Sequence, residues 1–208
     1  MGRNTEAQCR ECRAEGQKLF LKGKKCYTAK CILERRKFGP GQHGKGRKKF
    51  SEYKVQLREK QKLRKIYGIF EKQFRNYFAK ASRKKGITGD NLVSLLETRL
   101  DNVVFKSGLV TSRASARQFV GHGHVKVNGR KVDVSSFQTK SGDVVTLKDS
   151  EKSKTLAKES LEYTSSREVP GWLNVDPKAQ TVNIIRELDA EDIKVPVNVQ
   201  LIVELYSK

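Results

Sequence analysis

Four cysteines, all within the first 31 residues, are the side chains best suited to bind a metal ion. Cys9 and Cys12 form a C-x2-C pair, and thirteen residues later Cys26 and Cys31 form a C-x4-C pair. Both spacings are typical of structural zinc sites, in which four thiolates surround the ion in a tetrahedron. Since four ligands close the site to catalysis, we expect one structural Zn²⁺. Two alternatives stay open, namely four reduced cysteines without metal and an iron–sulfur cluster.

A second candidate site is a short basic hairpin. Asn128-Gly129 is the dipeptide preferred in two-residue type I′ hairpin turns. With that turn, Lys126 lies directly opposite Lys131 on one face of the hairpin. Like charges placed opposite each other destabilise a sheet in water, and a bound anion would remove this penalty. The hairpin is therefore a candidate anion-binding surface, the alternative being an ordinary surface hairpin.

The helix that precedes the hairpin should carry further cations. Ser112 is a favourable N-cap, and Gly121 is suited to end the helix. Arg113 and Arg117 are four residues apart, so we expect them on one side of this helix.

The overall charge indicates a polyanionic partner. The 208 residues include 44 Lys and Arg against 23 Asp and Glu, which gives a net charge of +21 and a pI near 10.0. Nucleic acid is the first candidate and an anionic membrane surface the second. Residues 151–208 hold 8 basic and 10 acidic residues, so the positive charge lies before them. We find no secretory signal and no apolar run long enough to span a bilayer.

The remaining sequence predicts the elements that position these side chains. Residues 1–50 have no sustained helical or strand period, so a metal would have to order them. Ser51 should cap a helix that Gly68 ends. Further on, the patterns predict helices over 70–81 and from a cap at Asp90 to Val104, a strand over 144–147, loosely helical structure over 151–167, and strands over 181–185 and 200–206.

Several distinctive segments, in their order and spacing, resemble one known family. They are Pro40-Gly41-Gln42-His43-Gly44, Gln56 to Arg64, Arg99 to Val104, Ser112 to Gly129, and Leu201 to the last residue. Together they resemble the family of small ribosomal subunit protein four of bacteria, over nearly the whole chain. The middle segment looks like the RNA-binding module named after that protein. The four cysteines look like those of the zinc-binding members.

This resemblance implies an α+β fold in three parts. A zinc-knuckle N-terminal arm would comprise residues 1–50. A small helical domain would comprise residues 51–91 and 170–208, completed by C-terminal strands. Residues 92–169 would form an inserted α/β RNA-binding module, with short helices and a small antiparallel sheet.

The resemblance also implies a function. The chain would be a structural constituent of the small ribosomal subunit that binds 16S ribosomal RNA at a multi-helix junction, nucleates assembly of the subunit body and contributes to translational accuracy. Its partners would be 16S ribosomal RNA, neighbouring small-subunit proteins, especially protein five, and messenger RNA near the channel where it enters the subunit. It would be cytoplasmic, with no membrane or small-molecule partner.

Folded RNA is contacted mainly through phosphates, sugars and shape, to which arginine and lysine are suited. We expect RNA contacts in the arm and first helix from Arg35, Arg36, His43, Arg47, Arg58, Lys62 and Arg64, and in the module from Arg113, Arg117, His122, His124, Lys126 and Lys131. The alternative from another class is an RNA-modifying enzyme that carries the module. It would need a positioned acid, base or nucleophile, for which the sequence offers no domain.

Overall fold

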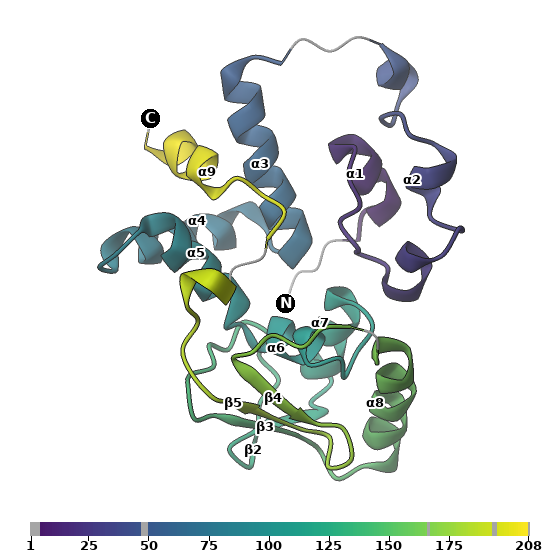
Figure 1. The fold of residues 1–208 in the computed structure, drawn as a ribbon, viewed down its shortest axis with the longest axis vertical. Helices are drawn as coiled ribbons and strands as arrows, with labels where there is room; N and C mark the ends of the chain where they lie inside the picture. The colour runs from purple at the N-terminus through teal and green to yellow at the C-terminus, as the bar shows by residue number, and fades with distance from the viewer. Residues whose placement is uncertain (1–4, 47–49, 166, 193–194, 208) are drawn as a thin grey trace. The chain divides into compact units, whose positions relative to one another are not determined.

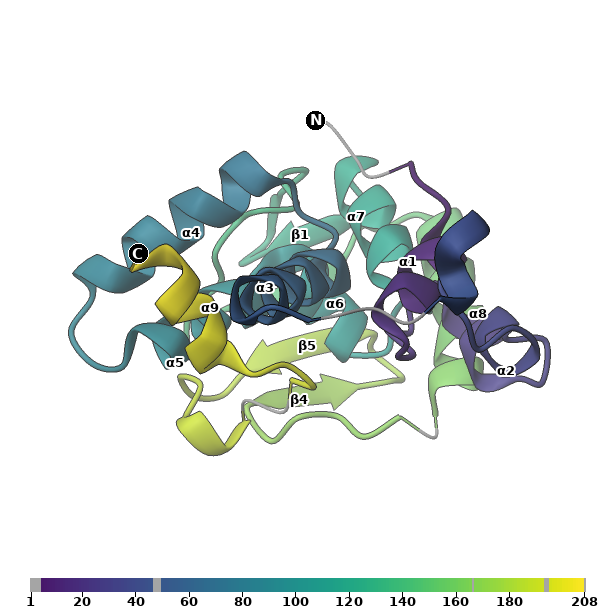
Figure 2. The ribbon, with the colours of Figure 1, turned by 90° about the horizontal axis from the view of Figure 1, so that it is seen from above.

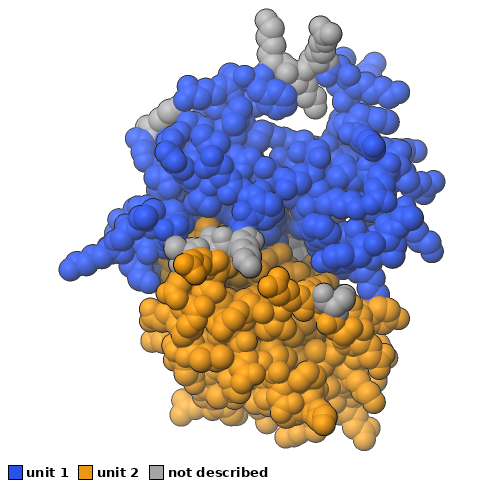
Figure 3. Space-filling model, in the orientation of Figure 1, with its two compact units in different colours: residues 1–92, 195–208 blue, residues 93–194 orange. Residues whose placement is uncertain are grey.

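The computed structural model describes residues 5–46, 50–165, 167–192 and 195–207. The chain divides into two compact units, which comprise residues 1–92 with 195–208 and residues 93–194 (Figure 3). The first unit is helical in its described part, and the second combines helices with a sheet. No helix in the described ranges is both long and apolar enough to cross a membrane.

The longest helix of the first unit begins and ends where the sequence predicts. Up to residue 83, the elements of this unit are α1 (Gln8–Glu15), the 3-10 turn η1 (Gly23–Tyr27), α2 (Ile32–Arg35), the 3-10 turn η2 (Gln42–Lys45), α3 (Glu52–Tyr67) and α4 (Glu71–Arg83) (Figure 1). The side chain of Ser51 accepts a hydrogen bond from the Lys54 N–H at 3.3 Å and so caps α3. Gly68 ends α3 with a φ of 64°, which glycine adopts without strain.

The C-terminal segment is a helix, α9 (Val199–Tyr206), so the strand predicted over 200–206 is wrong. The Asn198 side chain caps it by accepting a hydrogen bond from the Gln200 N–H at 3.1 Å. Ile202 is fully buried, and the Tyr206 ring stacks on Phe78 with a centroid distance of 4.5 Å. Figures 1 and 2 both show α9 beside α3. A short apolar run fits a strand or a helix equally well, and here packing against α3 and α4 decides.

The segment predicted as one helix up to Val104 forms two, α5 (Thr88–Glu97) and α6 (Leu100–Lys106). Because α5 begins at Thr88, Asp90 lies in its first turn and is not its cap. The chain is extended at Arg99, where it forms a bridge with Gln138. The break between α5 and α6 therefore allows pairing with a distant residue, which the local hydrophobic periodicity cannot predict.

The second unit contains one antiparallel sheet with the strand order β2-β1-β3-β5-β4. Its strands are β1 (Val125–Val127), β2 (Arg130–Lys131), β3 (Val144–Leu147), β4 (Leu173–Asp176) and β5 (Thr181–Ile184). The predictions over 144–147 and 181–185 are confirmed as β3 and β5. However, β5 pairs with β3, and β4 pairs with β5. Residues 173–184 therefore extend this sheet, whereas residues 170–208 were expected to complete the helical domain.

In the described part of this unit, the sheet is accompanied by α6, α7 (Arg113–Gly121) and α8 (Glu151–Thr164), and the 3-10 turn η3 (Ala190–Asp192) follows β5. Apolar side chains of α6, α7 and the strands share one core with the buried Trp172. The helix α8 confirms the expectation for 151–167, and its Thr164 hydroxyl donates to the Gly108 carbonyl at 2.8 Å. The predicted α+β class is thus confirmed.

Candidate nucleic-acid interface

The hairpin between β1 and β2 has the predicted turn and register. Asn128 and Gly129 both have positive φ, 50° and 79°, as a type I′ turn requires. Lys126 is the cross-strand partner of Lys131. Val127 is buried beneath the hairpin, while Lys131 is exposed. The hairpin therefore carries two lysines at directly opposite positions on its polar side.

The turn from α7 into β1 lies beneath one of these lysines. Ser112 caps α7 as predicted, by accepting a hydrogen bond from the Ser115 N–H at 3.2 Å. The helix ends at Gly121, as predicted, and the left-handed residue that then turns the chain is Gly123, with a φ of 71°. A Cβ on Gly123 would lie 2.3 Å from Cε of Lys131. Glycine at this position thus lets the Lys131 side chain lie across the turn.

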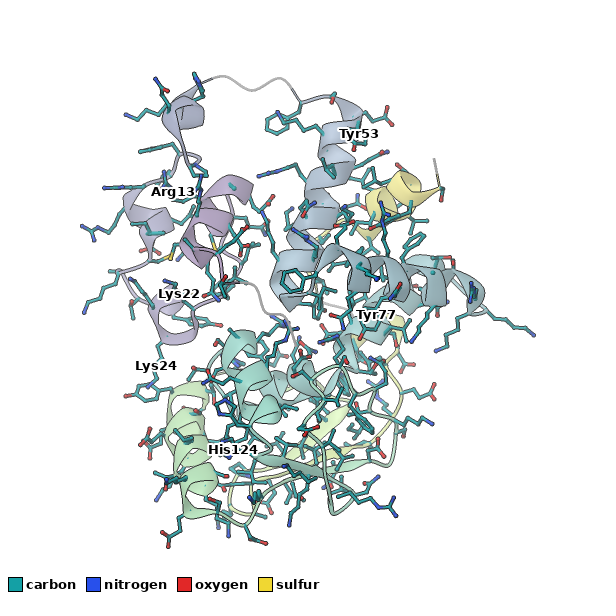
Figure 4. The ribbon with its side chains drawn as sticks, turned by 180° about the vertical axis from the view of Figure 1, so that it is seen from behind. Arg13, Lys22, Lys24, Tyr53, Tyr77 and His124 are labelled. Carbon is teal, nitrogen blue, oxygen red and sulfur yellow. The ribbon has the colours of Figure 1, made fainter. Side chains whose placement is uncertain are left out.

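The two histidines of this turn differ in their surroundings. His122 is exposed, whereas the ring of His124 lies 4.8 Å from the Phe119 ring and its Nδ1 is 2.8 Å from the Ser153 hydroxyl of α8 (Figure 4). Burial lowers the pKa of His124, and the charges of His122 and Lys148 lower it further. His124 is therefore held neutral and packed, which leaves His122 as the more accessible of the two.

Arg113 and Arg117 project from one side of α7, toward the start of α6. Nη2 of Arg117 forms an ion pair with Asp101 at 3.0 Å, and the buried Arg99 pairs with the same carboxylate at 2.7 Å. Nε of Arg113 donates to Asn102 at 2.8 Å. Sequence analysis missed the pairing of Asp101 with Arg117 and of Asn102 with Arg113, because these partners are more than ten residues apart along the chain. The two arginines are thus fixed by the protein itself.

Two exposed cations that the prediction did not include lie near the hairpin. Arg130 pairs with Val127 across the hairpin, and Lys148 donates its backbone N–H to the His124 carbonyl at 2.8 Å. Asp149 directly follows Lys148, and its pKa is lowered by a hydrogen bond from Lys154 and, at longer range, by the charge of Lys126. Arg130 directly follows the Asn-Gly turn, and this position in the sequence would have indicated it as a further candidate for RNA contact.

In the first unit, the predicted cations of α3 connect this helix to other elements. Nε of Arg58 lies 3.2 Å from Glu15 of α1, and Arg58 also donates to the Ala14 carbonyl. Lys62 pairs with Glu59, and Arg64 lies 3.7 Å from Glu71. Arg35, Arg36 and His43 of the arm are exposed, and Arg47 lies outside the described residues.

The four cysteines lie in the arm, three of them buried and Cys9 half-buried. Burial raises the pKa of the Cys12 and Cys26 thiols, and the neighbouring cysteines raise it further. Backbone N–H groups donate to both sulfurs, with Lys22 N at 3.3 Å from Cys26 Sγ. Within the described ranges, no group of three or more His, Cys, Asp or Glu side chains is arranged to hold a metal ion. The thiols are thus neighbours that accept backbone hydrogen bonds, which suits thiolate ligands, but they do not form a tetrahedral set.

Comparison with known proteins agrees with this architecture. The family description "Ribosomal protein S4/S9 N-terminal domain" matches residues 3–97, and "S4 domain" matches residues 98–145. The boundary between the two matches falls at the break between α5 and α6.

Curated relatives match over the full length of both chains. A protein of Desulfitobacterium hafniense (strain Y51) is 56% identical over 209 residues, one of Ruminiclostridium cellulolyticum is 52% identical over 208, and one of Geobacter sp. (strain M21) is 53% identical over 208. Each covers 100% of this chain and of its own, and each is named small ribosomal subunit protein uS4. The chain therefore belongs to the uS4 family of small ribosomal subunit proteins.

Proposed function

We propose that this chain binds 16S ribosomal RNA at a multi-helix junction, nucleates assembly of the body of the small ribosomal subunit and contributes to translational accuracy. The family supplies the broader role, because its members are structural ribosomal proteins of the cytoplasmic small subunit with an S4 RNA-binding domain. The alternative of an RNA-modifying enzyme is not supported, since the family is not enzymatic.

The facing pair of Lys126 and Lys131 is the observation that carries the RNA-binding proposal. Among the described residues, neither lysine forms an ion pair with a carboxylate. Like charges on directly opposite residues of a sheet destabilise it in water, so the free energy of this pair falls when a phosphate lies near both lysines. Folded RNA supplies closely spaced phosphates, which a surface of this kind can contact without reading sequence.

The cations beside the hairpin would orient this contact. Asp101 and Asn102 hold the guanidinium groups of Arg117 and Arg113 in set directions. A cation that is already ordered loses less side-chain entropy when it meets a phosphate. We assign the RNA-binding module to residues 92–169 together with β4 and β5, and the exposed cations of residues 1–50 to a second contact surface.

Salt dependence of RNA affinity tests this proposal. The dissociation constant of the full-length protein for transcribed 16S ribosomal RNA should rise steeply between about 50 and 200 mM salt, with a linear log–log relation. Affinity that barely changes over this range would contradict phosphate binding as the mechanism.

We further propose that Cys9, Cys12, Cys26 and Cys31 hold one structural Zn²⁺. The support is the spacing of the pairs and the backbone N–H groups that donate to Cys12 and Cys26. Such donors stabilise the negative charge of thiolate ligands. When bound, zinc would cross-link α1 to the segment around η1 and α2, which has few buried apolar side chains of its own.

We also propose contacts with neighbouring small-subunit proteins, especially protein five, and with messenger RNA near the channel where it enters the subunit. Family resemblance is the support for this placement. Cross-linking of assembled small subunits, followed by mass spectrometry, should join this chain to protein five, and subunits that yield no such cross-link would contradict it.

A further inference from the structure

A basic cleft of about 470 Å³ lies in the first unit, between the arm and the first turns of α3. Arg13 at the end of α1 and Tyr53 at the start of α3, both labelled in Figure 4, mark the two elements that border it. Its volume is within the roughly 300–1,000 Å³ typical of pockets that hold small molecules. A single nucleotide is of this size class.

Four cations and two carboxylates line the cleft. The carboxylates are already neutralised, because Glu15 is almost fully buried against Arg58 and Lys65, and Glu59 pairs with Lys62. The remaining positive charge comes from Arg13 and from the exposed Lys37. An anionic ligand is therefore favoured over a neutral or cationic one.

Aromatic and aliphatic side chains line the same cleft. Phe50 is 62% exposed, and Val55, one turn into α3, is 38% exposed. The ammonium of Lys54 lies 4.9 Å from the centre of the Phe50 ring, which leaves the opposite face of that ring for stacking. By contrast, the ring of Phe38 has both Arg13 and Lys45 over it, at 5.2 and 5.1 Å. Phe50 is thus the ring on which a flat group can stack.

The part of the cleft lined by Gly39 and Gly44 depends on glycine. A Cβ on Gly44 would lie 2.0 Å from the Gly39 carbonyl oxygen, so only glycine lets the loop fold back on itself here. Gly41 has a φ of 88°, which also favours glycine. The loop therefore builds a compact backbone wall beside the cations and does not itself supply a reactive group.

We propose that this cleft accepts one unstacked nucleotide of the bound RNA, with its base on Phe50 and its phosphate on the side of Arg13 and Lys37. An exposed ring beside a basic groove is the arrangement by which proteins hold single-stranded nucleic acid. This inference rests on the proposed RNA-binding function and adds a site for a base that has left its helix, separate from the hairpin of the S4 domain.

Two matched pairs of variants of the full-length protein test the inference. Phe50→Leu keeps the apolar bulk but removes the ring, whereas Phe50→Tyr keeps the ring. Val55→Trp fills the cleft, whereas Val55→Ala leaves it open. Affinity for transcribed 16S ribosomal RNA should fall about five- to tenfold for Phe50→Leu and for Val55→Trp, and should stay within about twofold of wild type for Phe50→Tyr and Val55→Ala.

Ultraviolet cross-linking of the wild-type complex should also attach a nucleotide at Phe50. Circular dichroism and thermal melts establish that the four variants are folded, so that a loss of affinity reports the cleft. If all four bind RNA as wild type does, the cleft holds no nucleotide, and a partner protein's side chain becomes its candidate occupant. If Phe50→Leu and Phe50→Tyr lose affinity equally, stacking is not the interaction. The proposed function fails separately, if the wild-type protein itself shows no salt-dependent RNA binding.

Discussion

Lys126 and Lys131 are direct cross-strand partners on the polar face of a hairpin whose other face is buried. This arrangement is unfavourable in the free protein and favourable in a complex with phosphate. We therefore expect Lys131→Glu to stabilise the free protein by about 0.2–1 kcal/mol, measured by denaturant unfolding. The same change should weaken RNA binding and reduce the slope of the salt dependence by about 1 to 2.

The control for this charge reversal is Lys178→Glu, an equal change of net charge in the loop between β4 and β5 at the opposite edge of the sheet. It should leave RNA affinity nearly unchanged. Normal binding by Lys131→Glu would mean that this face of the hairpin is not on RNA.

Gly121 and Gly123, which are two residues apart, provide a second test. Gly123→Ala places a Cβ at positive φ and displaces Lys131, so we expect a loss of about 1–2 kcal/mol in unfolding free energy together with weaker RNA binding. At Gly121 a Cβ meets nothing within 4 Å and the backbone is helical, so Gly121→Ala should stabilise the protein by about 0.5–1 kcal/mol. Equal effects of the two substitutions on unfolding would refute the proposed role of Gly123.

The carboxylate of Asp101 accepts hydrogen bonds from both Arg99 and Arg117 and is almost fully buried. We expect Asp101→Asn to cost about 3–5 kcal/mol, because it removes the charge that balances a buried guanidinium. Asp189→Asn, which breaks an exposed ion pair with Arg186, should cost less than about 1 kcal/mol. Chemical denaturation of both variants measures the difference, and similar losses would show that burial adds nothing to the Asp101 pair.

Zinc content and its removal test the cysteine proposal. Elemental analysis of native protein should find about one zinc per chain, and no iron. Removal by a chelator, or the change Cys26→Ser, should lower the melting temperature and expose the arm to proteolysis while the second unit stays protected. Protein isolated without metal, yet with a protected arm, would mean that the thiols are structural in reduced form.

Stability in acid should depend on Glu71. Burial opposes its ionisation, but hydrogen bonds from Lys60 and Tyr206 and the charges of Lys60 and Arg64 outweigh burial and lower the pKa of Glu71. A folded-state pKa below the unfolded value adds stability that is fully present above the unfolded pKa and is lost as the pH falls through the folded pKa.

Glu71→Gln should therefore lower the melting temperature at neutral pH and have little effect once the pH is below the folded pKa. The side chain is 34% exposed, so solvent screening limits the neutral-pH effect to about 1 kcal/mol. A difference that persists unchanged in strong acid would show that charge is not its source.

Features that depend on nearest neighbours in the sequence were predictable. The caps Ser51 and Ser112 and the Asn128-Gly129 turn follow from hydrogen bonding and backbone preference within a few residues, and the structure has all three. The hairpin register follows from that turn, which is why the opposite positions of Lys126 and Lys131 were predictable from the sequence alone.

Features that depend on distant contacts were not predictable. The apolar run of α9 fits a strand until its packing on α3 is known, including the hydrogen bond from Gln56 to Glu204. The break at Arg99 and the roles of Asp101 and Asn102 likewise depend on pairing with residues far along the chain. Several arginines and lysines predicted to contact RNA also form ion pairs within the protein. These pairs were not predictable, because a basic sequence does not reveal which cations have carboxylate partners.

The packing of α9 on α3 has a consequence for biosynthesis. Residues 93–194 form a unit that is continuous in sequence, whereas the helical unit joins residues before 93 to residues after 194. All residues of the sheet-containing unit are therefore synthesised before those of α9. Because domains generally fold as units, the helical unit can complete its packing only after α9 has been synthesised. The helix α3 is synthesised early, but the part of its apolar face that packs on α9 is covered only after α9, one of the last segments, has been made.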